Sequence, residues 1–139
     1  MDQKTGIDLP GETTGTISSQ EWKEANFPGD PWRIGDTYHS AIGQYGTQVT
    51  PIAMARASAM MANGGHPVTP TILKQDTSPV LAPSLGIPDS YFTVIHEGMR
   101  DTGISGTSKN LSTLKVHIAV KTGSAELGAK KQYMYSWIT

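Results

Sequence analysis

Cysteine is absent from this sequence of 139 residues, so disulfide bridges and cysteine-ligated metal sites are excluded. The redox compartment stays open, because a chain without cysteine fits reducing and oxidising surroundings equally well. No apolar run reaches the roughly 18 residues that a membrane-spanning helix needs. The net charge is only −1, so the charge balance does not point to nucleic acid or an anionic membrane surface as a partner.

The composition is that of a loop-rich chain without a generous core. Hydrophobic residues make up 37% of the sequence, and 15 glycines accompany nine prolines. The length suits a single domain. Four histidines show neither metal-ligand spacing nor an accompanying carboxylate cluster, so we expect no metal and no cofactor. They are His39, His66, His96 and His117.

The first 50 residues are expected to be loop-rich. Ser18, followed three residues later by Glu21, predicts one short helix with Ser18 as its cap. The glycine-rich stretch 35–46 indicates a loop or a short strand. No helix or strand is expected ahead of residue 6, which suggests that the chain begins inside a larger protein.

Two helices are predicted from their capping and stop signals. Thr50 is a good N-cap and Pro51 suits the first helical position, which predicts a helix over residues 51–63. A second helix is predicted over residues 90–102, with Gly103 as its stop.

The stretch 116–124 is the best strand candidate. Its apolar residues alternate with others at the period of two that is typical of a half-buried strand. It ends in Lys121-Thr122-Gly123-Ser124, which combines a point charge, two hydroxyls and a glycine that lets a ligand approach the main chain. This combination suits binding of a carboxylate or phosphate, although Lys-Thr-Gly alone more often marks a polar turn. The start of a second strand is predicted before residue 139.

A series of short motifs follows in order along the chain: Thr5-Gly6-Ile7-Asp8-Leu9-Pro10-Gly11-Glu12, Gly35-Asp36-Thr37-Tyr38, Ala41-Ile42-Gly43-Gln44, Thr50-Pro51, Ala62-Asn63-Gly64-Gly65, Glu97-Gly98-Met99-Arg100, Lys121-Thr122-Gly123-Ser124-Ala125-Glu126 and Ser136-Trp137. Each motif is weak alone, but their joint order is specific. Together they make residues 1–139 resemble the C-terminal part of the transpeptidase domain of class B (monofunctional, elongation-type) penicillin-binding proteins. Ser124 replaces the family's usual threonine and keeps the hydroxyl.

That resemblance implies an α+β fold: part of the penicillin-binding transpeptidase fold, an antiparallel sheet with flanking helices. It implies a peptidoglycan D,D-transpeptidase, which cross-links stem peptides through an acyl-serine intermediate that β-lactams trap. Lys121, Thr122, Gly123 and Ser124 would bind the carboxylate of the stem peptide or β-lactam, and the backbone N–H of Ser124 would be an oxyanion donor. The substrate would lie along the strand edge as an added strand.

The family's nucleophile motif, Ser-x-x-Lys, precedes Ser-x-Asn, and both come well before Lys-Thr-Gly. Here the two patterns occur as Ser112 to Lys115 and Ser108 to Asn110, in reversed order and crowded before Lys121. No helix is expected that would place Ser112 and Lys115 on one face. We interpret both as chance matches. The resemblance then implies that the nucleophile lies in sequence before Met1 and that this chain is inactive alone.

Two alternatives stay open. The chain could be an independently folding, non-catalytic β-lactam-sensing or partner-binding module, or a serine enzyme that uses Ser112. The resemblance implies a parent anchored in the cytoplasmic membrane with this domain outside, and the sequence shows no signal peptide or anchor. Because the expected sheet would be incomplete, unpaired strand edges are predicted to favour self-association.

Overall fold

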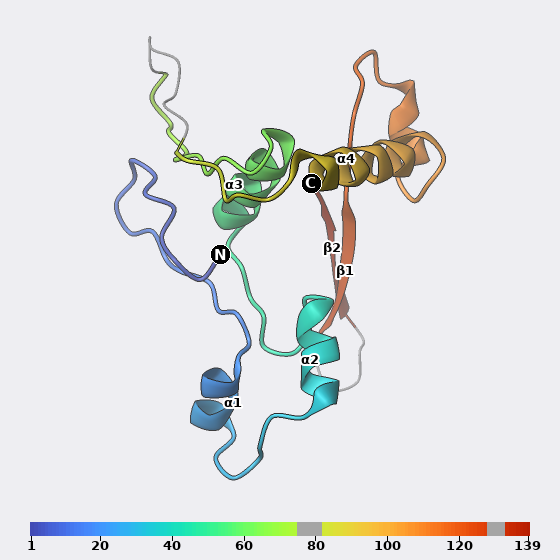
Figure 1. Cartoon of the computed structure of the whole chain (residues 1–139). Helices are drawn as coiled ribbons and strands as arrows, with labels where there is room; N and C mark the ends of the chain where they lie inside the picture. The colour runs from blue at the N-terminus through green and yellow to red at the C-terminus, as the bar shows by residue number, and fades with distance from the viewer. Residues whose placement is uncertain (75–81, 128–132) are drawn as a thin grey trace. The chain divides into compact units, whose positions relative to one another are not determined.

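A computed structural model of the chain describes residues 1–74, 82–127 and 133–139. The described residues form two compact units, one of residues 1–57 and 69–74 and the other of residues 58–68, 82–127 and 133–139. Helices and a two-stranded antiparallel sheet give the expected α+β class. The elements, in order, are α1 (Gln20–Asn26), α2 (Ile34–Ala41), α3 (Pro51–Ala62), α4 (Asp89–Ile104), the 3₁₀ helix η1 (Lys109–Thr113), β1 (Thr122–Leu127) and β2 (Tyr133–Ile138) (Figure 1).

The first unit contains a buried lysine. Lys23 of α1 is only 2% exposed, and its Nζ lies 2.6 Å from Oδ2 of Asp36 in α2 and 3.1 Å from Oδ2 of Asp30. Nζ also donates a hydrogen bond to the carbonyl oxygen of Pro31 at 3.1 Å. A buried ammonium is costly unless it is paired, so these three partners account for its place in the interior and tie α1 to α2.

Aromatic rings pack the loops of the same unit. The ring of Tyr45 lies 5.5 Å from that of Trp22, 6.5 Å from that of Phe27 and 6.2 Å from that of Trp32, measured between centroids. Gly46 follows Tyr45 at φ +75°, and a Cβ on it would stand 2.2 Å from the Trp22 ring. Residue 46 therefore has to be a glycine for this cluster to close.

The cap of α1 differs from the prediction by one residue. Ser19, not Ser18, is the N-cap, and its Oγ accepts the N–H of Trp22 at 3.1 Å. Ser18 is buried instead, and its Oγ donates to Oγ of Ser40 at 2.9 Å. The hydroxyl of Ser18 was therefore unavailable for the helix end.

The stretch 35–46, predicted as a loop or short strand, contains most of α2. This helix is fixed at its start by Asp36, whose carboxylate reaches back to accept the N–H of Arg33 at 2.7 Å. This is one of the two hydrogen bonds of a capping box, the bond from the N-cap backbone N–H to the side chain at the third helical position. The sequence pattern was missed because arginine is not a usual cap residue.

Helix α3 spans Pro51–Ala62, where a helix over 51–63 was predicted. The predicted cap is present, since Oγ1 of Thr50 accepts the N–H of Ala53 at 3.2 Å. At the other end the N–H of Gly65, at φ +86°, donates to the carbonyl oxygen of Met60 at 2.8 Å. Such bonds from residues with positive φ close the last turn of a helix.

Helix α4 runs past its predicted stop. It spans Asp89–Ile104, whereas a helix over 90–102 ending at Gly103 was predicted. Gly103 is buried inside the helix, and a Cβ on it would lie 3.1 Å from Cγ1 of Ile118. The glycine therefore serves a close approach between α4 and the segment that leads into β1, and does not end the helix.

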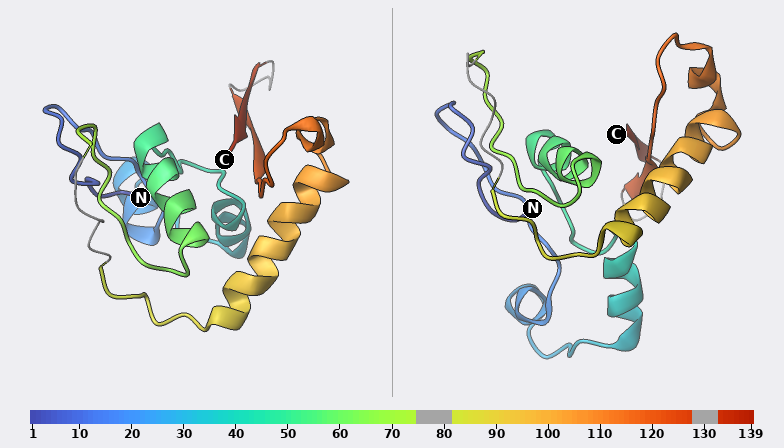
Figure 2. Two further views of the ribbon diagram at one scale, coloured as in Figure 1. Left: turned by 90° about the horizontal axis from the view of Figure 1, so that it is seen from above. Right: turned by 45° about the horizontal axis from the view of Figure 1, so that its top comes forward.

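The predicted strand over 116–124 is wrong in its bounds, because β1 begins only at Thr122. Residues 116–121 are an extended segment leading from η1 to β1 (Figure 2), and no strand pairs with residues 116–120 among the described residues. Their alternation reflects packing on a helix: Val120 is buried and its N–H donates to the carbonyl oxygen of Met99 in α4 at 2.9 Å. The sequence also predicts a hairpin turn over residues 127–132, and residues 128–132 of it lie outside the described part of the chain.

Candidate functional site

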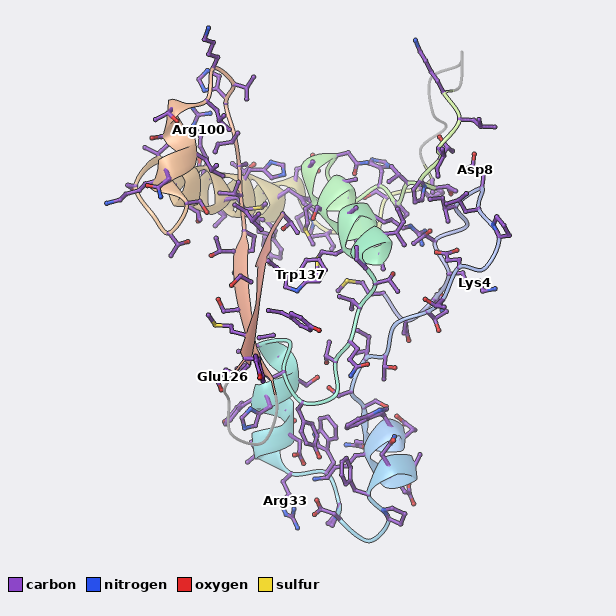
Figure 3. All side chains as sticks on the ribbon, turned by 180° about the vertical axis from the view of Figure 1, so that it is seen from behind. Lys4, Asp8, Arg33, Arg100, Glu126 and Trp137 are labelled. Atoms are coloured by element: carbon purple, nitrogen blue, oxygen red, sulfur yellow. The ribbon has the colours of Figure 1, made fainter. Side chains whose placement is uncertain are left out.

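The Lys121-to-Ser124 segment lies where the extended segment joins the sheet. The main chains of Lys121 and Thr139 exchange two hydrogen bonds, with N···O distances of 2.9 and 3.1 Å. The pairing continues into β1 and β2, where Gly123 faces Trp137 and Ser124 faces Ser136; Trp137 is labelled on β2 in Figure 3. The strand that carries the motif is therefore fixed in register from its first residue.

This register decides where the backbone N–H groups of the motif point. In an antiparallel pair, hydrogen-bonded and non-hydrogen-bonded residue pairs alternate. Because Lys121 and Thr139 form a hydrogen-bonded pair, Gly123 is in the next such pair, and Thr122 and Ser124 are in non-hydrogen-bonded pairs. The N–H and C=O groups of Thr122 and Ser124 therefore point away from β2, toward the other edge of β1.

No strand occupies that other edge among the residues that the structure describes. The N–H of Ser124 is thus placed to donate to a ligand that lies alongside β1, as an added peptide strand would. Gly123 leaves the main chain uncovered there: a Cβ on it would stand 3.8 Å from Cβ of Trp137, an ordinary contact. Packing against Trp137 therefore does not require a glycine at this position, and access of a ligand gives a separate reason for it.

The side chains of the motif divide between exposed and half-buried positions. Lys121 is exposed, and its Nζ donates a hydrogen bond to the carbonyl oxygen of Thr122. Ser124 is exposed on the same face of β1 as Thr122, because residues two apart in a strand share a face. The Oγ1 atoms of Thr122 and Thr107 lie 2.9 Å apart. One charge and two hydroxyls thus stand beside a free strand edge, which is the chemistry that holds a carboxylate.

Thr107 was missed by the sequence analysis. It lies in the loop between α4 and η1, 15 residues before Thr122, and no spacing pattern links the two. The loop is fastened to the end of α4: the N–H of Gly106 donates to the carbonyl oxygen of Asp101 at 3.1 Å, and the N–H of Ser108 to that of Thr102 at 3.1 Å. Helix α4 therefore places Thr107 as well as the entry to β1.

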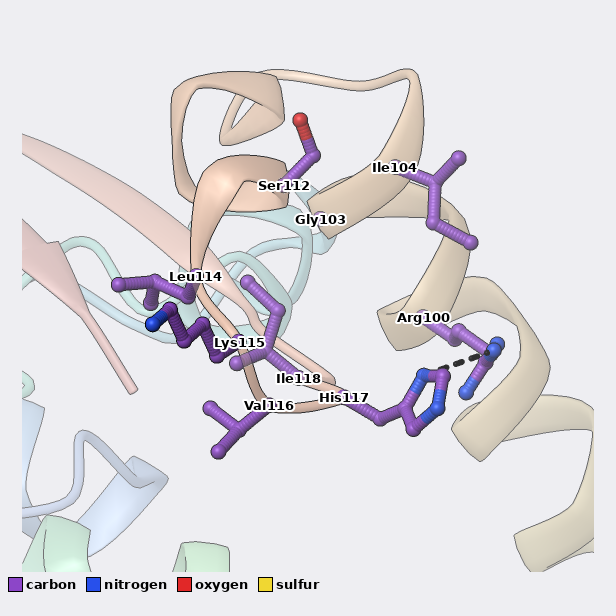
Figure 4. A pocket seen from close by; sticks show the side chains of 9 residues that line it. All are labelled: Arg100, Gly103, Ile104, Ser112, Leu114, Lys115, Val116, His117 and Ile118. Atoms are coloured by element: carbon purple, nitrogen blue, oxygen red, sulfur yellow. Dashed lines mark hydrogen bonds between the residues drawn. The ribbon is translucent and has the colours of Figure 1, made fainter.

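The Ser-x-x-Lys pattern of Ser112 to Lys115 lies at the same end of the unit. Ser112 lies in η1, which ends at Thr113, and Lys115 follows in the extended segment. Both line a shallow pocket, but Figure 4 shows their side chains pointing in different directions, with Lys115 Nζ turned away from Ser112. A serine nucleophile needs its base in hydrogen-bond reach, so this arrangement does not activate Ser112.

His117 lines the same pocket, beside Arg100. Its Nδ1 is 3.3 Å from Nη2 of Arg100, and both side chains are exposed (Figure 4). His117 is not hydrogen-bonded to any motif residue among the contacts described. Within the described ranges, no three histidine or acidic side chains gather in a way that could hold a metal ion.

Comparison with known proteins identifies the family to which this chain belongs. The sequence model of the penicillin-binding protein transpeptidase domain matches residues 1–139. The chain is a member of that family. Among relatives, peptidoglycan D,D-transpeptidase MrdA of Acinetobacter baumannii is 33% identical over 134 residues, which cover 90% of this chain and 20% of that protein.

Solved structures of penicillin-binding proteins agree in fold. Penicillin-binding protein 2 of Helicobacter pylori, in a complex with MreC, matches with a TM-score of 0.81 at 27% identity, over 99% of this chain and 26% of that one. Penicillin-binding protein 2 of Pseudomonas aeruginosa, in complex with WCK 5153, matches with a TM-score of 0.75 at 30% identity, over 91% and 29% of the two chains. The chain thus spans only 20–29% of the length of these three proteins.

Proposed function

We propose that this chain supplies the carboxylate-binding and oxyanion side of a peptidoglycan D,D-transpeptidase site. The observation that carries the proposal is the free edge of β1, where the outward N–H of Ser124 lies beside the hydroxyls of Thr122 and Ser124 and the ammonium of Lys121. Membership of the transpeptidase family indicates the class of reaction, and β1 with Lys121 provides the N–H, hydroxyl and ammonium groups that would bind the substrate.

Each group has a distinct role in this proposal. Lys121, Thr122 and Ser124 bind the terminal carboxylate of a D-Ala-D-Ala stem peptide, or the carboxylate of a β-lactam. The N–H of Ser124 donates to the oxyanion of the tetrahedral intermediate, a type of contact whose loss costs about 2.7–4 kcal/mol. Gly123 leaves room for the peptide main chain, which lies along β1 as an added strand.

The acyl-accepting serine is then supplied by a part of the whole protein that this chain does not contain. Ser112 and Ser108 are not assigned that role, because the Lys115 side chain points away from Ser112 and Ser108 is buried. We propose that the whole protein is anchored in the cytoplasmic membrane with this domain outside. Among the described helices, none is long and apolar enough to cross a membrane.

A titration tests the binding roles in the chain itself. The probe is N,N′-diacetyl-L-lysyl-D-alanyl-D-alanine, and the readout is the backbone amide spectrum of the ¹⁵N-labelled chain. We expect shifts centred on Thr122 and Ser124, and an affinity lower by about ten- to a hundredfold in Lys121→Ala, because a hydrogen bond to a charged group contributes about 1.5–3 kcal/mol. Lys115→Ala is the matched control. Equal affinity in Lys121→Ala and wild type would contradict the proposal.

A segment exchange separates an enzyme site from the alternative, a non-catalytic β-lactam-sensing or partner-binding module. Residues 1–139 replace the matching segment of the Acinetobacter relative, and acylation by a fluorescent penicillin is measured alongside thermal melting. A site of the proposed kind restores acylation that depends on Lys121. A folded chimera that is not acylated, or that is acylated equally well with Lys121→Ala, favours the module.

A further inference from the structure

The hydroxyl of Thr107 is placed to control the hydroxyl of Thr122. The two Oγ1 atoms lie 2.9 Å apart, and Thr107 is exposed whereas Thr122 is half-buried. A threonine hydroxyl carries one proton and two acceptor lone pairs. Within such a pair, one hydroxyl donates to the other, and the direction of donation decides which proton is left for a third group.

Only one direction of donation suits an anion at Thr122. If Thr122 donates to Thr107, its single proton is used and only lone pairs face a carboxylate, which repel it. If Thr107 donates to Thr122, the proton of Thr122 is free to point at the carboxylate. Donation also polarises the Thr122 hydroxyl and makes it a better donor, because hydrogen bonds in a chain strengthen one another.

Thr107 is held firmly enough to act in this way. Its loop bonds to the end of α4 through the N–H groups of Gly106 and Ser108. Gly106 packs so closely that a Cβ on it would stand 2.8 Å from Cα of Thr102. Thr122 is tied to the same helix through Val120, two residues earlier, whose N–H donates to Met99. The distance between the two hydroxyls is therefore set by α4 and not by two independent loops.

We propose that Thr107 is a positioning residue that donates its hydroxyl proton to Thr122 and so aims the Thr122 proton at the terminal carboxylate of a bound peptide. The proposal rests on the proposed function, since it assigns a residue to that same site. It gives the loop between α4 and η1 a part in recognising acidic chain ends. Thr107 itself does not touch the substrate.

The test compares two ligands that differ only at the chain end: N,N′-diacetyl-L-lysyl-D-alanyl-D-alanine and its C-terminal amide. Thr107→Val keeps the shape of the side chain and removes the hydroxyl. We expect Thr107→Val to weaken binding of the acid by about three- to tenfold, the range for one hydrogen bond, and to weaken binding of the amide less, because a neutral carbonyl oxygen accepts a weaker hydrogen bond than a carboxylate does. Thr107→Ser restores acid binding. Thr113→Val, which removes a hydroxyl bonded to the carbonyl oxygen of Asn110, is the matched control and binds both ligands as wild type does.

The preference for acid over amide is the readout that a merely structural role would not change. If Thr107 only stabilised its loop, Thr107→Val would weaken both ligands equally, and that result would overturn the proposal. A background of Thr122→Val gives a second check that does not depend on wild-type stability. There the further change Thr107→Val has no effect on acid binding if Thr107 acts through Thr122, and any additional loss refutes it.

Failure of this inference is distinguishable from failure of the proposed function. If the wild-type chain does not bind the acid, or binds it equally well with Lys121→Ala, the carboxylate site itself is wrong and the role of Thr107 falls with it. If Lys121→Ala weakens binding but Thr107→Val binds the acid as wild type does, the site stands and only the role of Thr107 is refuted.

Discussion

The ammonium of Lys23 lies 2.6 Å from Oδ2 of Asp36, and it joins two short helices in a part of the chain with few aliphatic residues to bury. The hydrogen bond from Lys23 lowers the pKa of Asp36 below its ordinary value, and the N–H of Arg33 acts in the same direction. Asp36 in turn raises the pKa of Lys23. The pair therefore links the stability of this unit to pH at both ends of the scale.

The acid side of that linkage gives the first prediction. Because the folded pKa of Asp36 is lowered, its contribution is present above the unfolded value of about 3.9 and is lost as the pH falls through the folded value. The contribution of Lys23 is present below about 10.4 and is lost as the pH rises through its raised folded value. Asp36→Asn should flatten the fall in unfolding free energy below pH 4, measured by urea denaturation, whereas Glu24→Gln on α1 should keep it. An unchanged slope in Asp36→Asn would contradict the linkage.

The contact between Gly46 and Trp22 gives the second prediction. Gly46→Ala places a Cβ 2.2 Å from the Trp22 ring, whereas Gly43→Ala, at nearly the same φ, meets nothing within 4 Å. Both variants carry the strain of positive φ, so their difference isolates the crowding. We expect Gly46→Ala to lower the free energy of unfolding by about 1–3 kcal/mol more than Gly43→Ala does. Equal losses would show that Trp22 moves aside without cost.

The third prediction concerns Ser112. Incubation with benzylpenicillin should leave the intact mass of the chain unchanged, because the Lys115 side chain turns away from Ser112 (Figure 4). Ser112→Ala should give the same spectrum. A one-to-one adduct that Ser112→Ala abolishes would make this chain a minimal serine enzyme and would reverse the assignment of the nucleophile.

The outer edge of β2 gives the fourth prediction, which concerns self-association. Ser136 faces Ser124 in a non-hydrogen-bonded pair, so its N–H points away from β1, and all six residues of β2 are exposed. We expect association that grows with concentration in analytical ultracentrifugation. Ser136→Pro should reduce it, because proline blocks this edge and removes no bond to β1. Tyr135→Pro, at a hydrogen-bonded position, should instead disrupt the hairpin. A wild-type chain that stays monomeric would contradict this expectation.

The sequence correctly predicted those helix ends that are determined by neighbouring residues. Thr50 and Pro51 mark the start of α3 because a cap and the first helical turn lie within four residues of each other. The prediction for the end of α4 was wrong because Gly103 allows close packing against Ile118, a residue from elsewhere in the chain, and does not end the helix. The strand bounds were wrong for the same reason. Alternation indicates burial on one side of a segment, and Val120 is buried against α4, while no strand pairs with it among the described residues.

The motif of the candidate site could be predicted from the sequence, but the contacts that position its groups could not. Lys121 and its neighbours could be singled out because charge, hydroxyls and glycine occur together in four residues. The outward N–H of Ser124 depends on the pairing of Lys121 with Thr139, and the contact with Thr107 depends on how a loop packs on α4. Both are set by tertiary structure, which no short sequence pattern encodes.

Residue-resolved hydrogen exchange at Gly123 and Ser124 tests the central claim most directly, because the register puts their N–H groups on opposite edges of β1. In the free chain we expect the amide of Gly123 to be protected and that of Ser124 to exchange quickly. Saturating N,N′-diacetyl-L-lysyl-D-alanyl-D-alanine should slow Ser124 by about tenfold or more and leave Gly123 unchanged. A Ser124 amide that is already protected in the free chain, or that the peptide does not slow, would contradict a substrate strand bound along this edge.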